Sequence, residues 1–142
     1  MSKRSQIILT ILTLLLISSP YFIAAGAGGD SFVFNGFLLN PLDGNSYLAK
    51  MHLGWQGDWR YSMLFSANHA PGTFLFLFYI LLGHLARILG IPLLLTFHLA
   101  RVLSAMILLI NMARFVRSVL TELDSKHQTF VYTLMCLGSG LG

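Results

Sequence analysis

The sequence predicts an all-α polytopic membrane protein, and three observations support this prediction. Of its 142 residues, 56% are hydrophobic, and the mean hydropathy is +0.73. Only 10% are charged, whereas a soluble domain typically has about 25% charged residues, so the chain has too few charges to coat a water-facing surface. Long uncharged runs also recur along the chain, and roughly 20 apolar residues suffice to cross a bilayer as a helix.

Composition and motifs exclude several classes of function. The nine basic and five acidic residues are scattered, and no basic block with interleaved aromatic residues indicates a nucleic-acid partner. Cys136 is the single cysteine, which excludes an intrachain disulfide and a cysteine-based zinc site. The motifs of nucleotide-binding loops, serine hydrolases and zinc proteases are absent, and the histidines do not fall at metal-ligand spacing.

The N-terminal segment has the pattern of a first transmembrane helix. Lys3 and Arg4 precede the uncharged run 7–25, and basic residues before a span place that end in the cytoplasm. A cleaved signal peptide is the alternative, since Ala25-Gly26-Ala27 resembles a small-residue cleavage site. The run is longer than a usual signal core and further apolar segments follow, which favours an uncleaved anchor.

Residues 26–72 form the long polar stretch of the chain and are expected outside the cytoplasm. Three of the five acidic residues lie here, together with Trp55 and Trp59, which suit the membrane–water interface. Within this stretch, residues 47–53 have apolar side chains at helical spacing, typical of a short amphipathic helix at the membrane surface. Loops of this length are usually functional.

Residues 73–91 are apolar but contain His84 and Arg87 near their end. If this segment crossed the membrane, the basic residues at and after the end of the segment 93–119 would lie outside, against the positive-inside rule. These residues are Arg114, Arg117 and Lys126. We therefore expect it to lie along the outer leaflet as a juxtamembrane helix, with residues 26–90 external and residues 93–119 returning through a plasma membrane of bacterial type. A transmembrane hairpin is the alternative.

The chain ends within a further apolar stretch of about 14 residues, shorter than a span requires. We therefore expect the sequence to be the N-terminal part of a longer polytopic protein. The predicted organisation is a first transmembrane helix (1–25), an external loop (26–72), a juxtamembrane or membrane segment (73–91), a second transmembrane helix (93–119), a cytoplasmic turn (120–128) and the start of another transmembrane helix (129–142).

Short motifs in the external loop resemble a known family. Asp43 and Tyr47 are four residues apart, Gly57-Asp58-Trp59 follows, and His69-Ala70-Pro71 precedes the apolar segment. This order of motifs, followed by Arg101 in the next membrane helix, resembles the first external loop of the GT-C class of integral-membrane glycosyltransferases. Among them, the loop resembles those of the protein O-mannosyltransferases and the lipid A aminoarabinose transferases.

The resemblance implies a glycosyltransferase that uses a polyprenyl-phosphate-linked sugar at the outer face of the membrane. It implies that Asp43 is the catalytic base, and that Arg101, Asp58, Tyr47 and His69 bind substrate. Its implied partners are the lipid-linked donor and membrane lipids. It implies no definite cofactor, although a divalent metal is compatible with it.

Each candidate residue also has a structural interpretation. Pro41-Leu-Asp43-Gly44 suits a turn, with Asp43 capping a helix from Ser46. Arg101 can snorkel toward the headgroups, although a charge inside an apolar helix indicates function by default. Gly44 stands where the families carry an acidic residue. This departure favours the alternative function, a non-catalytic polytopic protein such as a transporter or an assembly partner.

Overall fold

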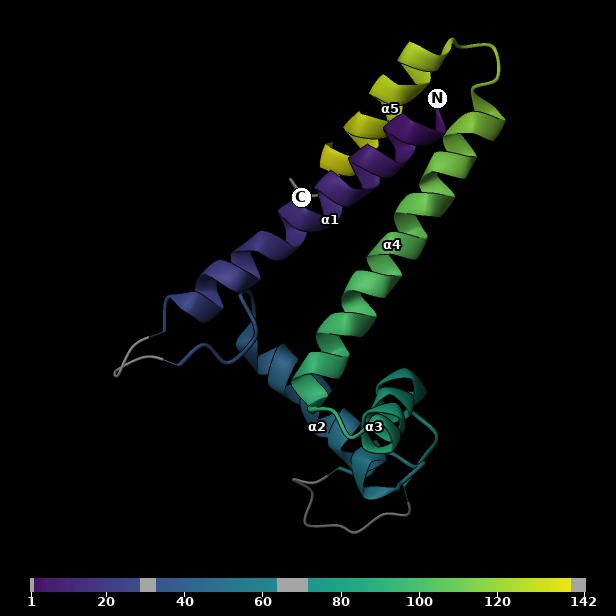
Figure 1. Cartoon of the computed structure of the whole chain (residues 1–142). Helices are drawn as coiled ribbons and strands as arrows, with labels where there is room; N and C mark the ends of the chain where they lie inside the picture. The colour runs from purple at the N-terminus through teal and green to yellow at the C-terminus, as the bar shows by residue number, and fades with distance from the viewer. Residues whose placement is uncertain (1, 29–32, 64–71, 139–142) are drawn as a thin grey trace. The chain divides into compact units, whose positions relative to one another are not determined.

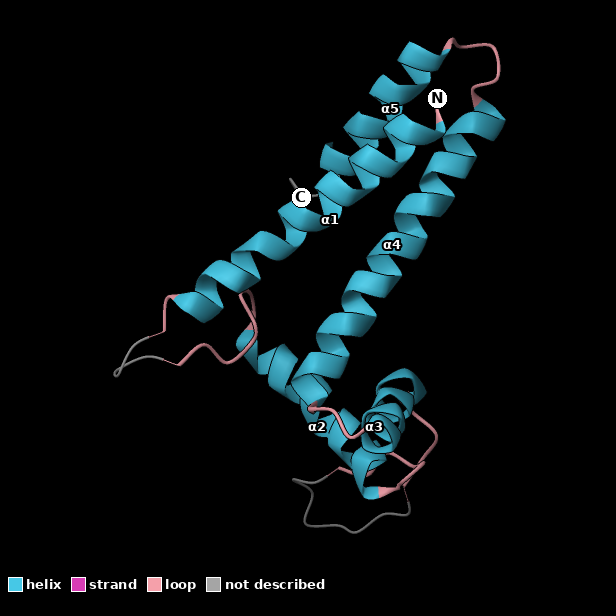
Figure 2. Cartoon of the chain, viewed as in Figure 1, coloured by secondary structure: helices cyan, strands magenta, loops and turns pink. Residues whose placement is uncertain are grey.

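The computed structural model describes residues 2–28, 33–63 and 72–138, and within these ranges the chain is helical without a β-strand (Figures 1 and 2). Its contacts divide it into two units, residues 24–101 and residues 1–23 with 102–142. The helices are α1 (Lys3–Gly26), α2 (Pro41–Gln56), α3 (Leu77–Leu89), α4 (Leu93–Val119) and α5 (Ser125–Gly138).

Two of these helices, α1 and α4, are long and apolar enough to cross a bilayer. They contain 24 and 27 residues, and each includes a window with mean hydropathy 2.2. At 1.5 Å per residue, helices of this length extend about 36–40 Å, which exceeds the bilayer core of about 30 Å. Only 6% and 11% of these windows are buried. With 13 residues, α3 extends only about 20 Å.

The first turn of α2 lies earlier than the sequence pattern predicted. We expected a helix over residues 47–53, or from Ser46 with Asp43 as its cap, but the helix begins at Pro41 after Asn40. Proline is favoured in the first turn because its φ is already helical and its missing N–H would have no partner there. Asp43 therefore lies inside the first turn, and the prediction that it caps the helix from outside is wrong.

In the unit formed by residues 24–101, α2 and α3 pack with their backbones in close contact (Figure 1). A Cβ atom on Gly54 would lie 2.0 Å from the carbonyl oxygen of Ile80, and one on Gly83 would lie 1.9 Å from that of Met51. Glycine at both positions thus permits this approach. Around the crossing, Met51 and Ile80 are fully buried, with Ala86 beside them on α3.

A short backbone pairing joins the segment after α2 to the segment before α3. The N–H of Tyr61 donates to the carbonyl of Thr73 at 2.8 Å, and the N–H of Thr73 donates to the carbonyl of Tyr61 at 3.0 Å. The ring of Tyr61 lies 5.0 Å from that of Phe76 in an edge-on arrangement. These contacts fix Tyr61 beside the start of α3.

The second unit contains most of α1, the rest of α4, and α5. Ala113, Val116 and Tyr132 form its buried cluster. The hydroxyl of Tyr132 is 2.9 Å from the hydroxyl of Thr10 and donates to the carbonyl of Leu109 at 3.3 Å. One buried hydroxyl therefore joins α1, α4 and α5.

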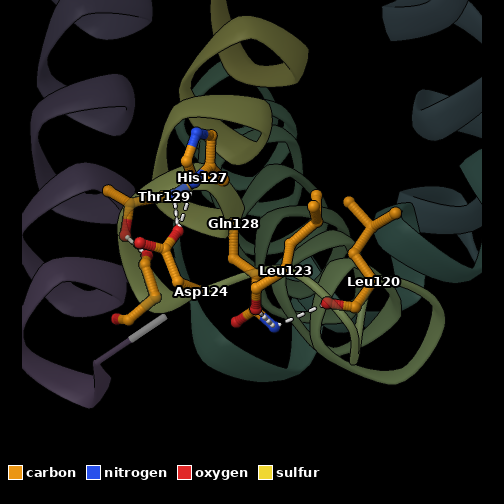
Figure 3. A network of polar contacts seen from close by, with 7 residues as sticks. Leu120, Leu123, Asp124, His127, Gln128 and Thr129 are labelled. Atoms are coloured by element: carbon orange, nitrogen blue, oxygen red, sulfur yellow. Dashed lines mark hydrogen bonds and ion pairs between the residues drawn. The ribbon is translucent and has the colours of Figure 1, made fainter.

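The helix α5 begins at Ser125, four residues before the apolar stretch that predicted it, so the proposed turn 120–128 is too long. Asp124 explains this start, because its carboxylate accepts hydrogen bonds from the backbone N–H of His127 at 2.9 Å and from the ring of His127 (Figure 3). Gln128 donates to the carbonyls of Leu120 and Leu123, which closes the turn after α4. Polar caps rather than apolar periodicity set this boundary.

Candidate functional site

The candidate base Asp43 is exposed in the first turn of α2. The side-chain amide of Asn40 donates a hydrogen bond to its carboxylate, and the backbone N–H groups at a helix start favour a negative charge there. Tyr47 follows four residues later, so the two residues share one face of α2. The spacing that carried the family resemblance is therefore one turn of a helix.

Gly44 has a structural role that the sequence did not reveal. It is buried under the ring of Phe37, and a Cβ atom at this position would lie 2.3 Å from that ring. The ring of Phe37 packs edge-on against Phe97 of α4 at 5.4 Å. Because Phe37 fills this space, the acidic residue of the resembling families would not fit here without displacing the ring.

Tyr47 lies in an aromatic cluster between three parts of the same unit. Its ring stacks on Tyr79 of α3 at 4.8 Å with an interplanar angle of 3°, and it lies 6.1 Å from Phe97 of α4. Burial, and to a lesser degree Tyr47, raises the pKa of Tyr79 above its ordinary value. Tyr47 therefore joins α2 to its neighbours rather than extending freely toward a substrate.

Lys50 is a functional candidate that our interpretation of the sequence missed. Its ammonium group lies 4.1 Å from the ring centroid of Phe76, 5.2 Å from that of Tyr47 and 5.7 Å from that of Tyr79. Distances below about 6 Å permit cation–π attraction. The signal in the sequence was the spacing of Asp43, Tyr47 and Lys50, which places all three on one helical face.

A cavity of about 350 Å³ opens along this part of α2. Lys50 is the charged residue among the described residues of its lining, and their hydroxyl and amide groups are potential hydrogen-bond partners. Its volume lies at the lower end of the range of small-molecule sites. The lining residues are Leu42, Asn45, Ser46, Ala49, Lys50, Leu53, Tyr61 and Ser62.

Arg101 lies in α4, one turn beyond Phe97, and is partly buried. Residues four apart share a helical face, so Arg101 follows the ring that faces Tyr47 and Phe37. Its position, eight residues after the start of α4 at Leu93, corresponds to a depth of about 12 Å along the helix.

Asp58 and its neighbours lie at the other end of α2. Asp58 follows Gly57, the left-handed residue that ends α2 with φ 107°, and is therefore about 20 Å along the helix from Asp43. The backbone carbonyl of Asp58 is 3.1 Å from Nε2 of His84, and the ring of Trp59 stacks on His84 at 4.1 Å. The structure does not bring Asp58 to the face that carries Asp43.

His69, the remaining substrate-binding candidate, lies outside the described residues. In the described ranges, no group of three or more histidine, cysteine, aspartate or glutamate side chains could hold a metal ion.

The comparisons with known proteins add no family to this description. No protein-family model matches the chain, and no curated protein or solved structure matches it.

Proposed function

We propose that this chain forms part of a membrane glycosyltransferase that uses a polyprenyl-phosphate-linked sugar at the outer face of the membrane. The observation that supports this proposal best is the arrangement on α2. Asp43, exposed at the helix start, shares a face with Tyr47 and Lys50 beside a cavity. In the sequence, this helix and α3 stand between two helices of membrane-spanning length. The same order is implied by the resemblance to GT-C enzymes.

The proposed reaction needs a base and a positive charge for the leaving group. The Asp43 carboxylate takes the proton of the acceptor hydroxyl while the acceptor oxygen forms a bond to the anomeric carbon of the sugar. The bond between that carbon and the phosphate oxygen breaks, and the lipid phosphate leaves with the bonding electrons. Arg101 stabilises the negative charge on this phosphate, because its guanidinium donates two parallel hydrogen bonds to an anion.

The proposed placement puts α2 and α3 at the outer membrane surface. Pro92 separates α3 from α4, and α3 is too short to span the bilayer. Its side away from α2 exposes large apolar side chains, which fits contact with lipid. These residues are Leu77, Phe78, Leu81, Leu85 and Ile88.

The substitution Asp43→Asn tests this proposal in the full-length protein. It preserves the size of the side chain but removes the base, so transfer of labelled sugar from a polyprenyl-phosphate donor should fall by at least about 100-fold. Glu122→Gln is the matched control, because Glu122 is exposed in the turn between α4 and α5. Its activity should equal that of the wild type. If the Asp43→Asn protein retains more than about a tenth of the wild-type rate, Asp43 is not the base. If the wild-type protein itself transfers no sugar, the non-catalytic alternative is correct.

A further inference from the structure

The cavity along α2 begins beside the proposed base. Asp43 is not itself a lining residue, but Leu42, which precedes it, and Ser46, three residues after it, both line the cavity. A catalytic base must reach the hydroxyl whose proton it takes. On the proposed function, on which this step rests, the molecule that fills the cavity is therefore the acceptor.

The lining of the cavity is selective by charge. Among the described residues of the lining, Lys50 carries the charge and none is a carboxylate. The salt bridge found in the described ranges joins Asp124 and His127, so no described carboxylate neutralises Lys50. Ser46 and Ser62 add hydroxyl donors to the same lining. An ammonium group with neutral donors around it favours an anion.

The aromatic rings around Lys50 hold its ammonium group in place. The ammonium group lies near Tyr47 of α2 and near Phe76 and Tyr79 at the start of α3. Each ring face attracts the cation without neutralising its charge. A lysine side chain ordinarily loses considerable rotamer entropy when it binds a ligand. Because the rings already restrict Lys50, less of this entropy is lost on binding.

From these observations we infer that the cavity binds an acceptor carrying an anionic oxygen group, a phosphate or a carboxylate, which pairs with Lys50. The spacing on the helix also limits the size of this acceptor. Lys50 is seven residues beyond Asp43, which corresponds to about 10 Å along the axis. The anionic group therefore lies about 10 Å from the hydroxyl that receives the sugar. The apolar side chains of Leu42 and Leu53 also line the cavity.

Direct binding of matched probes to the full chain, purified in a non-ionic detergent, tests this inference. The probes are 8-hydroxyoctyl phosphate, 8-hydroxyoctanoate and uncharged 1,8-octanediol, each an extended molecule of roughly the inferred length. Calorimetry without any sugar donor should show that at least one anionic probe binds ten times more tightly than the diol, since hydrogen bonds to charged groups are the strong ones. The phosphate and carboxylate probes distinguish the two anions.

Variants at Lys50 identify the residue responsible. Lys50→Gln should bind the preferred anionic probe at least about tenfold more weakly, whereas Lys50→Arg keeps the charge and should stay within about threefold of wild type. Lys126→Gln is the matched control, because Lys126 is exposed at the start of α5, and its affinity should be unchanged. Equal binding of the anionic probes and the diol by the wild-type chain would overturn the inference, whatever the variants do.

The outcome is separable from that of the proposed function. Charge-dependent binding through Lys50 by a wild-type protein that transfers no sugar would leave the anion site standing and remove the glycosyltransferase proposal. Loss of transfer in the Asp43→Asn protein, with no preference of the wild type for anionic probes, would support the glycosyltransferase proposal and remove the anion site.

Discussion

At Gly44, the ring of Phe37 leaves no room for a side chain, so Gly44→Ala should destabilise the unit formed by residues 24–101. Overpacking typically costs about 1–3 kcal/mol, more than the gain of about 1 kcal/mol from replacing a helical glycine by alanine. Thermal unfolding followed by circular dichroism measures the change. Phe37→Leu should restore part of the loss in the double variant, and equal effects of Gly44→Ala with and without Phe37→Leu would contradict the packing argument.

Single residues of the site differ in how far the sequence predicts them. The spacing of Asp43 and Tyr47 predicts a shared helical face, because that relation depends only on local geometry. The role of Gly44 depends on Phe37, which lies outside the helix and packs on it from a loop. The role of Lys50 was not predicted because it depends on contacts with Phe76 and Tyr79, which are more than 25 residues away in the sequence. Local patterns do not reveal such contacts.

Among the elements, the crossing of α2 and α3 depends on two glycines. Gly83→Ala places a methyl group within van der Waals overlap of the Met51 carbonyl, and the backbone cannot move as a flexible side chain would. We expect the free energy of unfolding to fall by about 1–3 kcal/mol or more. Gly26→Ala is the control, because no atom lies within 4 Å of its added Cβ. Denaturant unfolding that shows equal stability for both variants would contradict this close approach.

The start of α5 should depend on pH through Asp124. Hydrogen bonds from the backbone N–H and the ring of His127 hold the pKa of Asp124 below its ordinary value. Because the pKa is lower in the folded state, the stabilisation is present above the unfolded pKa of about 3.9 and is lost as pH falls through the folded value. Amide exchange at His127, corrected for the intrinsic rate, should therefore accelerate at acid pH.

The variant Asp124→Asn provides the control for this effect. Asparagine can still accept the backbone hydrogen bond at a helix start but does not titrate. Its corrected exchange rate at His127 should be independent of pH over the same range, and a wild-type-like acid transition in this variant would assign the effect to another group.

The boundaries of the elements were harder to predict than their existence. The long apolar runs predicted helices near 1–25 and 93–119, and the structure has α1 over Lys3–Gly26 and α4 over Leu93–Val119. The starts of α2 and α5 were predicted too late, because the apolar pattern begins after the first turn in both. Asn40-Pro41 and Asp124 carried the relevant signals, and these signals are polar or conformational rather than hydrophobic.

For the whole molecule, the decisive question is the side of the membrane on which each segment lies. In a Cys136→Ser background, single cysteines replacing Gln56 and Leu89 should react with a membrane-impermeant thiol reagent in intact cells. A cysteine replacing Ser125 should not react. The positive-inside rule gives this result, because Arg114, Arg117 and Lys126 then lie in the cytoplasm with the N-terminus. Protection of position 89 with labelling of position 125 would show that the segment 73–91 crosses the membrane instead.

The helical character and the two helices of membrane-spanning length could be predicted from composition, but the internal contacts could not. Few charges and long apolar runs suffice to indicate membrane-length helices. The contact between Thr10 and Tyr132 joins residues that are 122 positions apart. Neither residue stands in a local sequence pattern that predicts its partner. Such contacts follow from helix packing, which the order of apolar residues along one helix does not specify.

This contact has a consequence for biogenesis. Helix α1 leaves the ribosome long before Tyr132 is synthesised. Until then, the hydroxyl of Thr10 can bond to the backbone of its own helix but not to Tyr132. The exchange of that local bond for the Tyr132 hydroxyl takes place after α5 is made. The closing of α1, α4 and α5 around their shared hydroxyl is thus a late event in synthesis.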